Sequence, residues 1–226
     1  MSRAPPRDLQ LQCRCGTVRA VAHGVAPQTG NHCVCYCDDC QAFAKALNRA
    51  DVLDANSGTD IFQLSQARLE FTHGLDRVAW LQLAPKGTAR WYASCCNTPI
   101  GNTLPTMGVP FIGVIRAFIR EPAGDALGPI RARVFPKFAT GDVAAIPPDN
   151  QSRWTMFLRL AALIISWRLR GDHKRSPFFD AVSGAPLRPP RVLTEAERGA
   201  LYLTGLEVGR RNSNWAVSVT SAAPDK

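Results

Sequence analysis

Residues 33–40 read Cys33-Val34-Cys35-Tyr36-Cys37-Asp38-Asp39-Cys40, so this short stretch holds four of the eight cysteines of the chain. The Cys37-x-x-Cys40 spacing is typical of a zinc knuckle, in which neighbouring thiolates grip one soft metal ion. Residues 32–37 are expected to form a strand, where alternation would turn Cys35 and Cys37 to the same side. This stretch predicts a fold organised around zinc.

The other four cysteines occur as two pairs. One pair lies in Cys13-Arg14-Cys15 and the other is Cys95-Cys96. Zinc in a structural site takes four tetrahedral ligands, so thiolates gathered from remote segments can complete a site together. We therefore expect two zinc ions.

Three other interpretations of the cysteines are less favoured. A disulfide framework is typical of secreted domains under about 100 residues, whereas this chain has 226 and its first ten residues form no apolar signal segment. Eight inert buried cysteines would rarely cluster so tightly. A thiol-exchange relay would require a thioredoxin-like βαβ context, which the sequence around the motif lacks. We expect a cytoplasmic protein with metal-bound thiolates.

The composition constrains the partners of the chain. Lys and Arg number 27 against 18 Asp and Glu, which gives a formal charge of +9. Zinc-bound thiolates lower this value, because each ligand is deprotonated. The remaining excess favours a small anionic molecule, and the scattered arginines argue against a dedicated nucleic-acid surface.

The pattern along the first part of the chain is mainly β, within an α+β fold overall. The alternation from Leu9 to Ala22 predicts one strand carrying Cys13 and Cys15. Asp38-Asp39 is typical of a helix start, so a short helix is expected from Cys40 to Leu47. Further short antiparallel strands are expected at 61–64, 68–72, 78–83, 90–93, 110–119 and 130–135.

The pattern changes after residue 140. A proline-containing hinge near 146–150 divides the chain into a zinc-binding β domain (9–140) and a C-terminal extension (141–226). The apolar run Trp154–Trp167 predicts a helix over about 152–170 and spans only about 21 Å, too short for a transmembrane segment. It is expected to dock on the β domain or in a homodimer, or else to contact a membrane surface weakly. A capping box at 194–197 predicts a last helix over about 194–203.

The order of the motifs resembles a known family. Cys13-Arg14-Cys15-Gly16 is followed by Cys35-Tyr36-Cys37-Asp38-Asp39-Cys40, and then by Cys96-Asn97-Thr98-Pro99. This order is similar to that of the glutathione-dependent formaldehyde-activating enzyme family, also called the centromere-protein-V-type domain (GFA-like). The similarity covers roughly residues 9–138. It implies coiled antiparallel β-sheets around one structural and one open zinc site.

The resemblance also implies which cysteines form each site. The structural site would use Cys13, Cys15 and Cys96, and the open site would use Cys35, Cys37 and Cys40. Two positions depart from the family pattern: Ala93 stands where a further cysteine is expected, and Tyr36 stands where a histidine is usual. Two cysteines are extra. Cys95 could replace the missing structural ligand if it lies in a turn. Cys33 could close the open site or reach across to fill the structural one.

Two functions follow from these expectations. In the first, a three-cysteine zinc site binds a small thiol such as glutathione, and the protein is a carbon–sulfur lyase or thiol-adduct enzyme similar to S-(hydroxymethyl)glutathione synthase. No catalytic residue is predicted beyond the metal ligands, although Arg14 and Arg90 could bind the carboxylates of glutathione. In the second, both sites are closed and the protein is a zinc-stabilised binding module.

Overall fold

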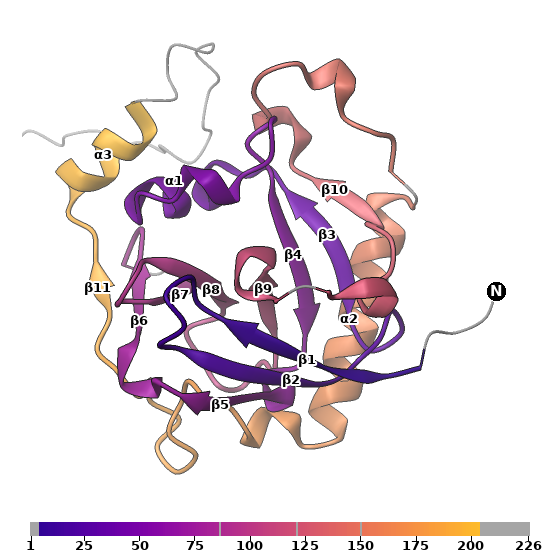
Figure 1. The fold of residues 1–226 in the computed structure, drawn as a ribbon, viewed down its shortest axis with the longest axis vertical. Helices are drawn as coiled ribbons and strands as arrows, with labels where there is room; N and C mark the ends of the chain where they lie inside the picture. Colours follow the sequence, from indigo (N-terminus) through magenta and orange to yellow (C-terminus); the bar gives the residue numbers. More distant parts are fainter. Residues whose placement is uncertain (1–4, 86, 121, 150, 204–226) are drawn as a thin grey trace, which may run out of the picture.

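The computed structural model describes residues 5–85, 87–120, 122–149 and 151–203, and it confirms a mainly β fold with helices toward the C-terminal end. The smaller of its two sheets has the strand order β1-β2-β5, formed by Arg7–Gln12, Arg19–Val25 and Leu69–His73. In Figure 1, β1 and β2 cross the strands of the larger sheet at a steep angle. No helix in the described part is long and apolar enough to cross a membrane.

The larger sheet has the strand order β10-β3-β4-β9-β8-β7-β6-β11. Its strands are β3 (Asn31–Cys35), β4 (Thr59–Leu64), β6 (Val78–Gln82), β7 (Ala89–Ala93), β8 (Thr98–Thr103), β9 (Ile112–Ile115), β10 (Ala132–Val134) and β11 (Arg191–Val192). The inner pairs are antiparallel as expected, but the edge strands β10 and β11 run parallel to β3 and β6. Both edge strands arrive by long connections, which permit a parallel pairing that a hairpin forbids.

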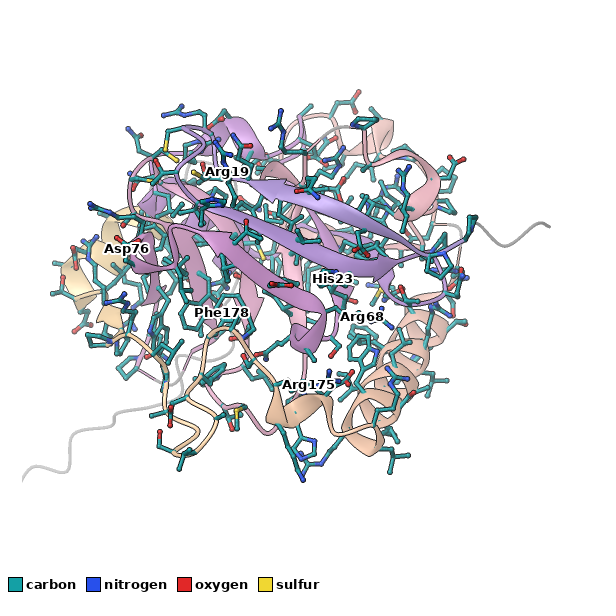
Figure 2. The ribbon with its side chains drawn as sticks, turned by 60° about the horizontal axis from the view of Figure 1, so that its bottom comes forward. Arg19, His23, Arg68, Asp76, Arg175 and Phe178 are labelled. Carbon is teal, nitrogen blue, oxygen red and sulfur yellow. The ribbon has the colours of Figure 1, made fainter. Side chains whose placement is uncertain are left out.

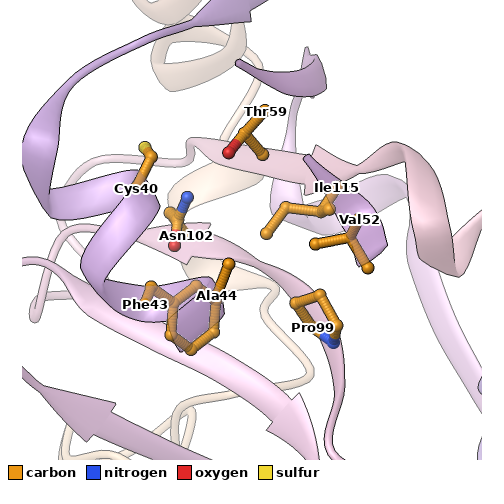
Figure 3. Close-up of a pocket in the computed structure, with 8 residues that line it drawn as sticks. All are labelled: Cys40, Phe43, Ala44, Val52, Thr59, Pro99, Asn102 and Ile115. Carbon is orange, nitrogen blue, oxygen red and sulfur yellow. The ribbon is translucent and has the colours of Figure 1, made fainter. Parts of the chain in front are cut away.

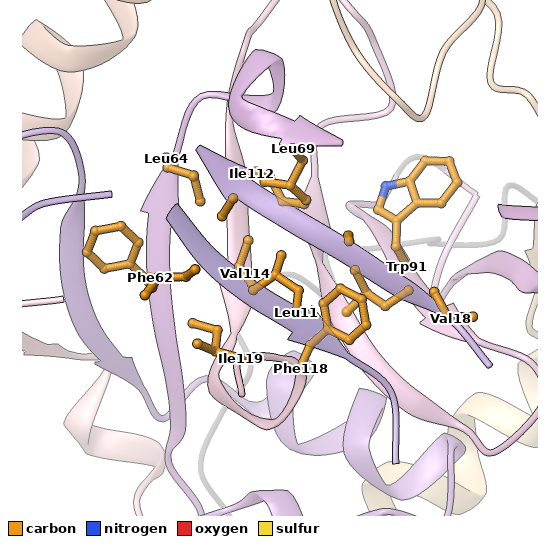
Figure 4. Close-up of a cluster of buried hydrophobic side chains, with 14 of the residues drawn as sticks. Leu11, Val18, Phe62, Leu64, Leu69, Trp91, Ile112, Val114, Phe118 and Ile119 are labelled. Atoms are coloured by element: carbon orange, nitrogen blue, oxygen red, sulfur yellow. The ribbon is translucent and has the colours of Figure 1, made fainter. Parts of the chain in front are cut away.

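The main core lies between the two sheets (Figure 4). Leu11 and Val18 from the small-sheet side meet large apolar residues such as Trp91 from the large sheet. Phe178 and Phe179, which follow residue 140, belong to the same core, and the Phe178 ring centroid lies 4.5 Å from that of Trp91. The segment after the predicted hinge therefore helps to build the β core.

The described residues form three α-helices: α1 (Asp38–Ala46), α2 (Arg153–Leu169) and α3 (Glu195–Leu203). α1 lies next to α3, and α2 packs beside β3 and β10 (Figure 1). Met156 and Trp167 bury one face of α2, and the Arg159 guanidinium donates to the carbonyls of Pro27 and Gly30 at 2.9 and 3.0 Å. The predicted docking of this helix on the β domain is confirmed.

The prediction of a single strand over residues 9–22 was wrong. The chain reverses between β1 and β2, and Cys13 and Cys15 lie in this turn. The Gly16 amide donates to the Cys13 carbonyl at 3.0 Å, and Gly16 has a φ of +81°. Since this left-handed conformation suits glycine, Gly16 marks the turn that the apolar alternation concealed.

Three other boundaries differ from the predictions. The expected strand 32–37 ends at Cys35, and Cys37 becomes the N-cap of α1. The expected strand 110–119 is only β9, because residues 116–118 form a 3₁₀ turn. Thr98-Pro99 begins the unpredicted strand β8, and the preceding turn occupies residues 94–97, where Asn97 has a φ of +55°.

Candidate metal centres

The first cysteine cluster joins two turns that are distant in sequence. Cys13 and Cys15 from the β1–β2 turn meet Cys95 and Cys96 from the β7–β8 turn, and all four sulfur atoms lie within 4.8 Å of one another. The Sγ–Sγ distances are 3.5 Å for Cys13–Cys15, 3.8 Å for Cys13–Cys95, 3.3 Å for Cys15–Cys95 and 3.9 Å for Cys95–Cys96. This four-cysteine cluster could hold a metal ion.

Hydrogen bonds around the four-cysteine cluster favour a thiolate at Cys15 and at Cys96, whereas burial raises the pKa of Cys13 and Cys95. The Thr98 hydroxyl lies 3.1 Å from the Cys96 sulfur and accepts bonds from the Arg14 amide at 3.0 Å and the Arg49 guanidinium at 3.2 Å. The buried Arg49 is fixed by Asp51 at 2.7 Å. Bonding with the hydroxyl and backbone of Thr17 lowers the pKa of Cys15 to about 6.

The second cluster is local in sequence. Cys35 ends β3, Cys37 caps α1 and Cys40 lies in its first turn, so the strand-to-helix transition brings the three sulfurs together within 4.8 Å. The Cys35 and Cys37 sulfurs are 3.3 Å apart, and the Cys40 amide donates to the Cys37 sulfur at 3.4 Å. A helix N-terminus stabilises nearby negative charge. This three-cysteine cluster could also hold a metal ion.

Arg90 is the cation beside the three-cysteine cluster. It projects from β7, is only 4% exposed, and places Nη1 3.9 Å from the Cys40 sulfur. Its guanidinium also reaches Asp39 at 3.3 Å and the Asn102 side-chain carbonyl at 3.4 Å. Hydrogen bonds from Cys35 and Cys37, together with Arg90, hold the pKa of Cys40 well below its usual value although burial opposes this.

Sequence reasoning gave Arg14 and Arg90 the same weight, but the structure separates them. The Arg14 backbone contacts the four-cysteine cluster through Thr98, whereas the Arg90 side chain contacts the three-cysteine cluster. A signal was present in the sequence: Arg90 stands between the apolar residues Ala89 and Trp91 in a short strand. A charge in a buried strand requires a partner, so it points to a polar site.

The remaining residues singled out in the sequence lie outside the two clusters. Within the described residues, Cys33 belongs to neither metal-ligand group; it is buried against Ile61 and Ala132, and burial raises its pKa to about 12. Ala93 is buried in β7 beside Thr98, and its methyl side chain has no atom that could coordinate a metal. Tyr36 donates its hydroxyl hydrogen to Asp54 at 3.1 Å.

A narrow pocket adjoins the three-cysteine cluster (Figure 3). Its empty volume is about 210 Å³, part of which is open to solvent. The walls are mostly apolar, and Thr59 and Asn102 supply the polar atoms beside Cys40. The eight lining residues are Cys40, Phe43, Ala44, Val52, Thr59, Pro99, Asn102 and Ile115.

The comparisons with known proteins identify a family. No curated protein matches the sequence. A crystal structure of a Rhodobacter sphaeroides protein aligns with 55% of this chain and 99% of its own at 15% identity, with a TM-score of 0.36, which does not establish a shared fold. Residues 6–187 match a family of unknown function and include both cysteine clusters. The chain therefore belongs to the family of unknown function DUF6151.

Proposed function

We propose that both cysteine clusters bind zinc. Four sulfurs at about 2.3 Å from one ion in a tetrahedron lie about 3.8 Å apart. Four of the six sulfur–sulfur distances in the four-cysteine cluster run from 3.3 to 3.9 Å and all six are below 4.8 Å, so its geometry is compatible with this arrangement. All-thiolate surroundings of this kind also favour zinc over magnesium or calcium. Since four protein ligands complete the coordination, this site is structural.

The three-cysteine cluster differs in one respect, and this difference carries the functional proposal. No fourth His, Cys, Asp or Glu ligand atom joins Cys35, Cys37 and Cys40 among the described residues. Three protein ligands and one exchangeable position are the arrangement of catalytic zinc sites. We infer that a small thiol such as glutathione takes this position, as the resemblance to the GFA-like family implies.

The proposed reaction is reversible addition of the thiol to a small aldehyde, as in a carbon–sulfur lyase of the S-(hydroxymethyl)glutathione synthase type. The sulfur–carbon bond forms, the carbonyl π pair moves to oxygen, and that oxygen takes the proton that the thiol released. Zinc would lower the pKa of the bound thiol. Arg90 balances the negative charge of the cluster from 3.9 Å, and the apolar pocket walls exclude water.

Cobalt substitution tests the open site. Co²⁺ in place of zinc gives thiolate-to-metal absorption that changes when another thiolate joins. We expect glutathione to alter this absorption, and S-methylglutathione, which has no free thiol, to leave it unchanged. An unchanged spectrum with glutathione would refute the open site.

A second candidate function is a zinc-stabilised binding module, and α2 is the observation that favours it. The helix buries one apolar face, yet its outer side still exposes Trp154, Leu158, Ile165 and Leu169. Such a surface is typical of a contact region. If this function holds, Leu158→Glu changes the sedimentation coefficient or the lipid binding of the protein while both zinc ions remain.

The proposed location is the cytoplasm. All eight cysteines are free in the structure, and cytoplasmic thiols are kept reduced, as metal binding requires. Labelling by a thiol reagent before and after zinc removal tests whether the cysteines are reduced and bound to metal. Thiols that become reactive only after zinc removal support it, and disulfides in freshly isolated protein contradict it.

A further inference from the structure

Thr59 is a buried hydroxyl with no hydrogen-bond partner among the described residues. It starts β4 and pairs in register with Cys35 on the neighbouring strand, so the two side chains lie on the same face of the sheet. Thr59 is 2% exposed, and its Oγ1 makes no hydrogen bond. Buried polar groups are normally bonded, and an orphan costs stability.

Thr59 faces a mostly apolar space beside the three-cysteine cluster. It lines the narrow pocket next to Cys40. Figure 3 shows its oxygen turned toward the side of the pocket that holds Cys40 and Asn102. Asn102 is already fixed by Arg90, which donates to its carbonyl oxygen at 3.4 Å. Thr59 therefore places an unengaged hydroxyl between the three-cysteine cluster and the apolar walls.

We propose that Thr59 donates a hydrogen bond to an oxygen atom of the molecule whose sulfur occupies the three-cysteine site. This inference rests on the proposed function and adds the ligand class: a thiol or thiol adduct with a hydroxyl or carbonyl oxygen within three carbons of the sulfur. The apolar walls, which include Phe43 and Ile115, contact its carbon atoms. Thr59 thus distinguishes oxygen-bearing from purely aliphatic thiols.

The thermal stability and ligand affinity of a Thr59→Val variant distinguish a ligand-binding role of the hydroxyl from a purely structural one. Valine has nearly the shape of threonine but no hydroxyl, so Thr59→Val removes the orphaned group and keeps the packing. If the hydroxyl serves a ligand, this variant gains thermal stability while it loses affinity for that ligand. If the hydroxyl supports the fold, the variant melts at a lower temperature. Thr59→Ser, which keeps the hydroxyl, is the matched control.

The experiment compares two thiols of nearly equal shape on the cobalt-substituted protein. 2-Mercaptoethanol carries a hydroxyl where 1-propanethiol carries a methyl group, and both bind through sulfur. We expect Thr59→Val to weaken 2-mercaptoethanol about 3- to 10-fold, the loss of one neutral hydrogen bond. 1-Propanethiol should bind as in the wild type, Thr59→Ser should retain the discrimination, and the Tm of metal-loaded Thr59→Val should rise.

The results separate the two proposals. If both thiols change the cobalt spectrum but Thr59→Val affects them equally or not at all, the role of Thr59 is refuted and the open site stands. A lower Tm for Thr59→Val together with unchanged affinities assigns the hydroxyl to the fold. If neither thiol changes the wild-type spectrum, the open site is refuted, and the ligand role of Thr59 with it.

Discussion

Two buried arginines mark the two cysteine clusters. Arg90 lies beside Cys40, and Arg49 contacts Thr98 beside Cys96. Each is paired with a half-exposed or exposed aspartate, Asp39 or Asp51. A cation held in place by a carboxylate offsets the negative charge of a thiolate cluster, and such outer groups tune metal affinity.

Replacing each arginine should therefore affect one site only. Methionine retains an unbranched apolar stem in place of the arginine stem and removes the charge. We expect Arg90→Met to weaken zinc at the three-cysteine site about 10- to 100-fold, and Arg49→Met to do the same at the four-cysteine site. Competition with a chromogenic chelator measures the zinc affinity of each variant, and native mass spectrometry counts the bound ions. Equal weakening of both sites by either variant would contradict this assignment.

Replacing the Cys33 sulfur by oxygen, in Cys33→Ser, tests whether the three-cysteine site lacks a fourth protein ligand. Because its sulfur lies outside the three-cysteine cluster, Cys33→Ser should keep two zinc ions per chain. The variant should lose about 1–3 kcal/mol of unfolding free energy, since a serine hydroxyl is costly in that apolar environment. Native mass spectrometry and urea unfolding measure the two effects. Cys40→Ser, the control, should lose one ion; loss of an ion from Cys33→Ser would make Cys33 a ligand.

At the scale of elements, cysteine spacing predicts a metal site only where all its ligands lie in one short segment of the chain. The strand-to-helix transition at residues 35–40 could be predicted, because Asp38-Asp39 follows an apolar strand directly. The β1–β2 turn was missed because apolar alternation continues through it, although Gly16 signals the reversal. No local pattern reveals that this turn meets the β7–β8 turn, since tertiary packing alone joins them. Parallel pairing of β10 with β3 is equally non-local.

His23, Asp8 and Glu70 form a pH-sensitive clamp on the outer face of the small sheet, in which the histidine contacts a carboxylate on each neighbouring strand. His23 of β2 contacts Asp8 of β1 and Glu70 of β5, each at 2.9 Å, and lies on the exposed side of the sheet (Figure 2). The hydrogen bonds to Asp8 and Glu70 raise the pKa of His23 above its ordinary 6.5, although burial opposes this. A backbone bond from Gly24, and then His23, lower the pKa of Asp8.

The clamp should stabilise the fold most at mildly acidic pH. A raised folded-state pKa means that the contribution of His23 is fully present below about 6.5 and is lost as pH rises through the folded value. The Asp8 contribution is present above its ordinary pKa and is lost as pH falls through its lowered value. Because both groups are exposed and screened, we expect His23→Gln to cost only about 0.5 kcal/mol.

Urea unfolding of the wild type and of His23→Gln measures this clamp. The difference should be clear near about pH 5.5 and should vanish near about pH 9. Comparing the two proteins at the same pH cancels the titration of the cysteine clusters. A difference that grows toward alkaline pH would contradict the clamp.

At the scale of the molecule, the two clusters connect very different lengths of chain. The four-cysteine cluster joins Cys13 to Cys95, 82 residues apart, and so ties the small sheet to the large one. The three-cysteine cluster joins only the end of β3 to the start of α1. Loop-closure entropy grows with loop length, so the long link restricts the unfolded chain more, by about 2 kcal/mol.

Removing the long link should therefore destabilise the protein more than removing the short one. We expect Cys95→Ser/Cys96→Ser to lower the unfolding free energy by about 2 kcal/mol more than Cys35→Ser/Cys37→Ser does. Burial alone predicts the reverse order, because Cys95 is exposed whereas Cys35 is buried. Native mass spectrometry first verifies that each variant has lost one ion, and urea unfolding monitored by circular dichroism then ranks them. A larger loss for Cys35→Ser/Cys37→Ser would show that core packing, rather than the cross-link between the sheets, dominates the contribution of these cysteines.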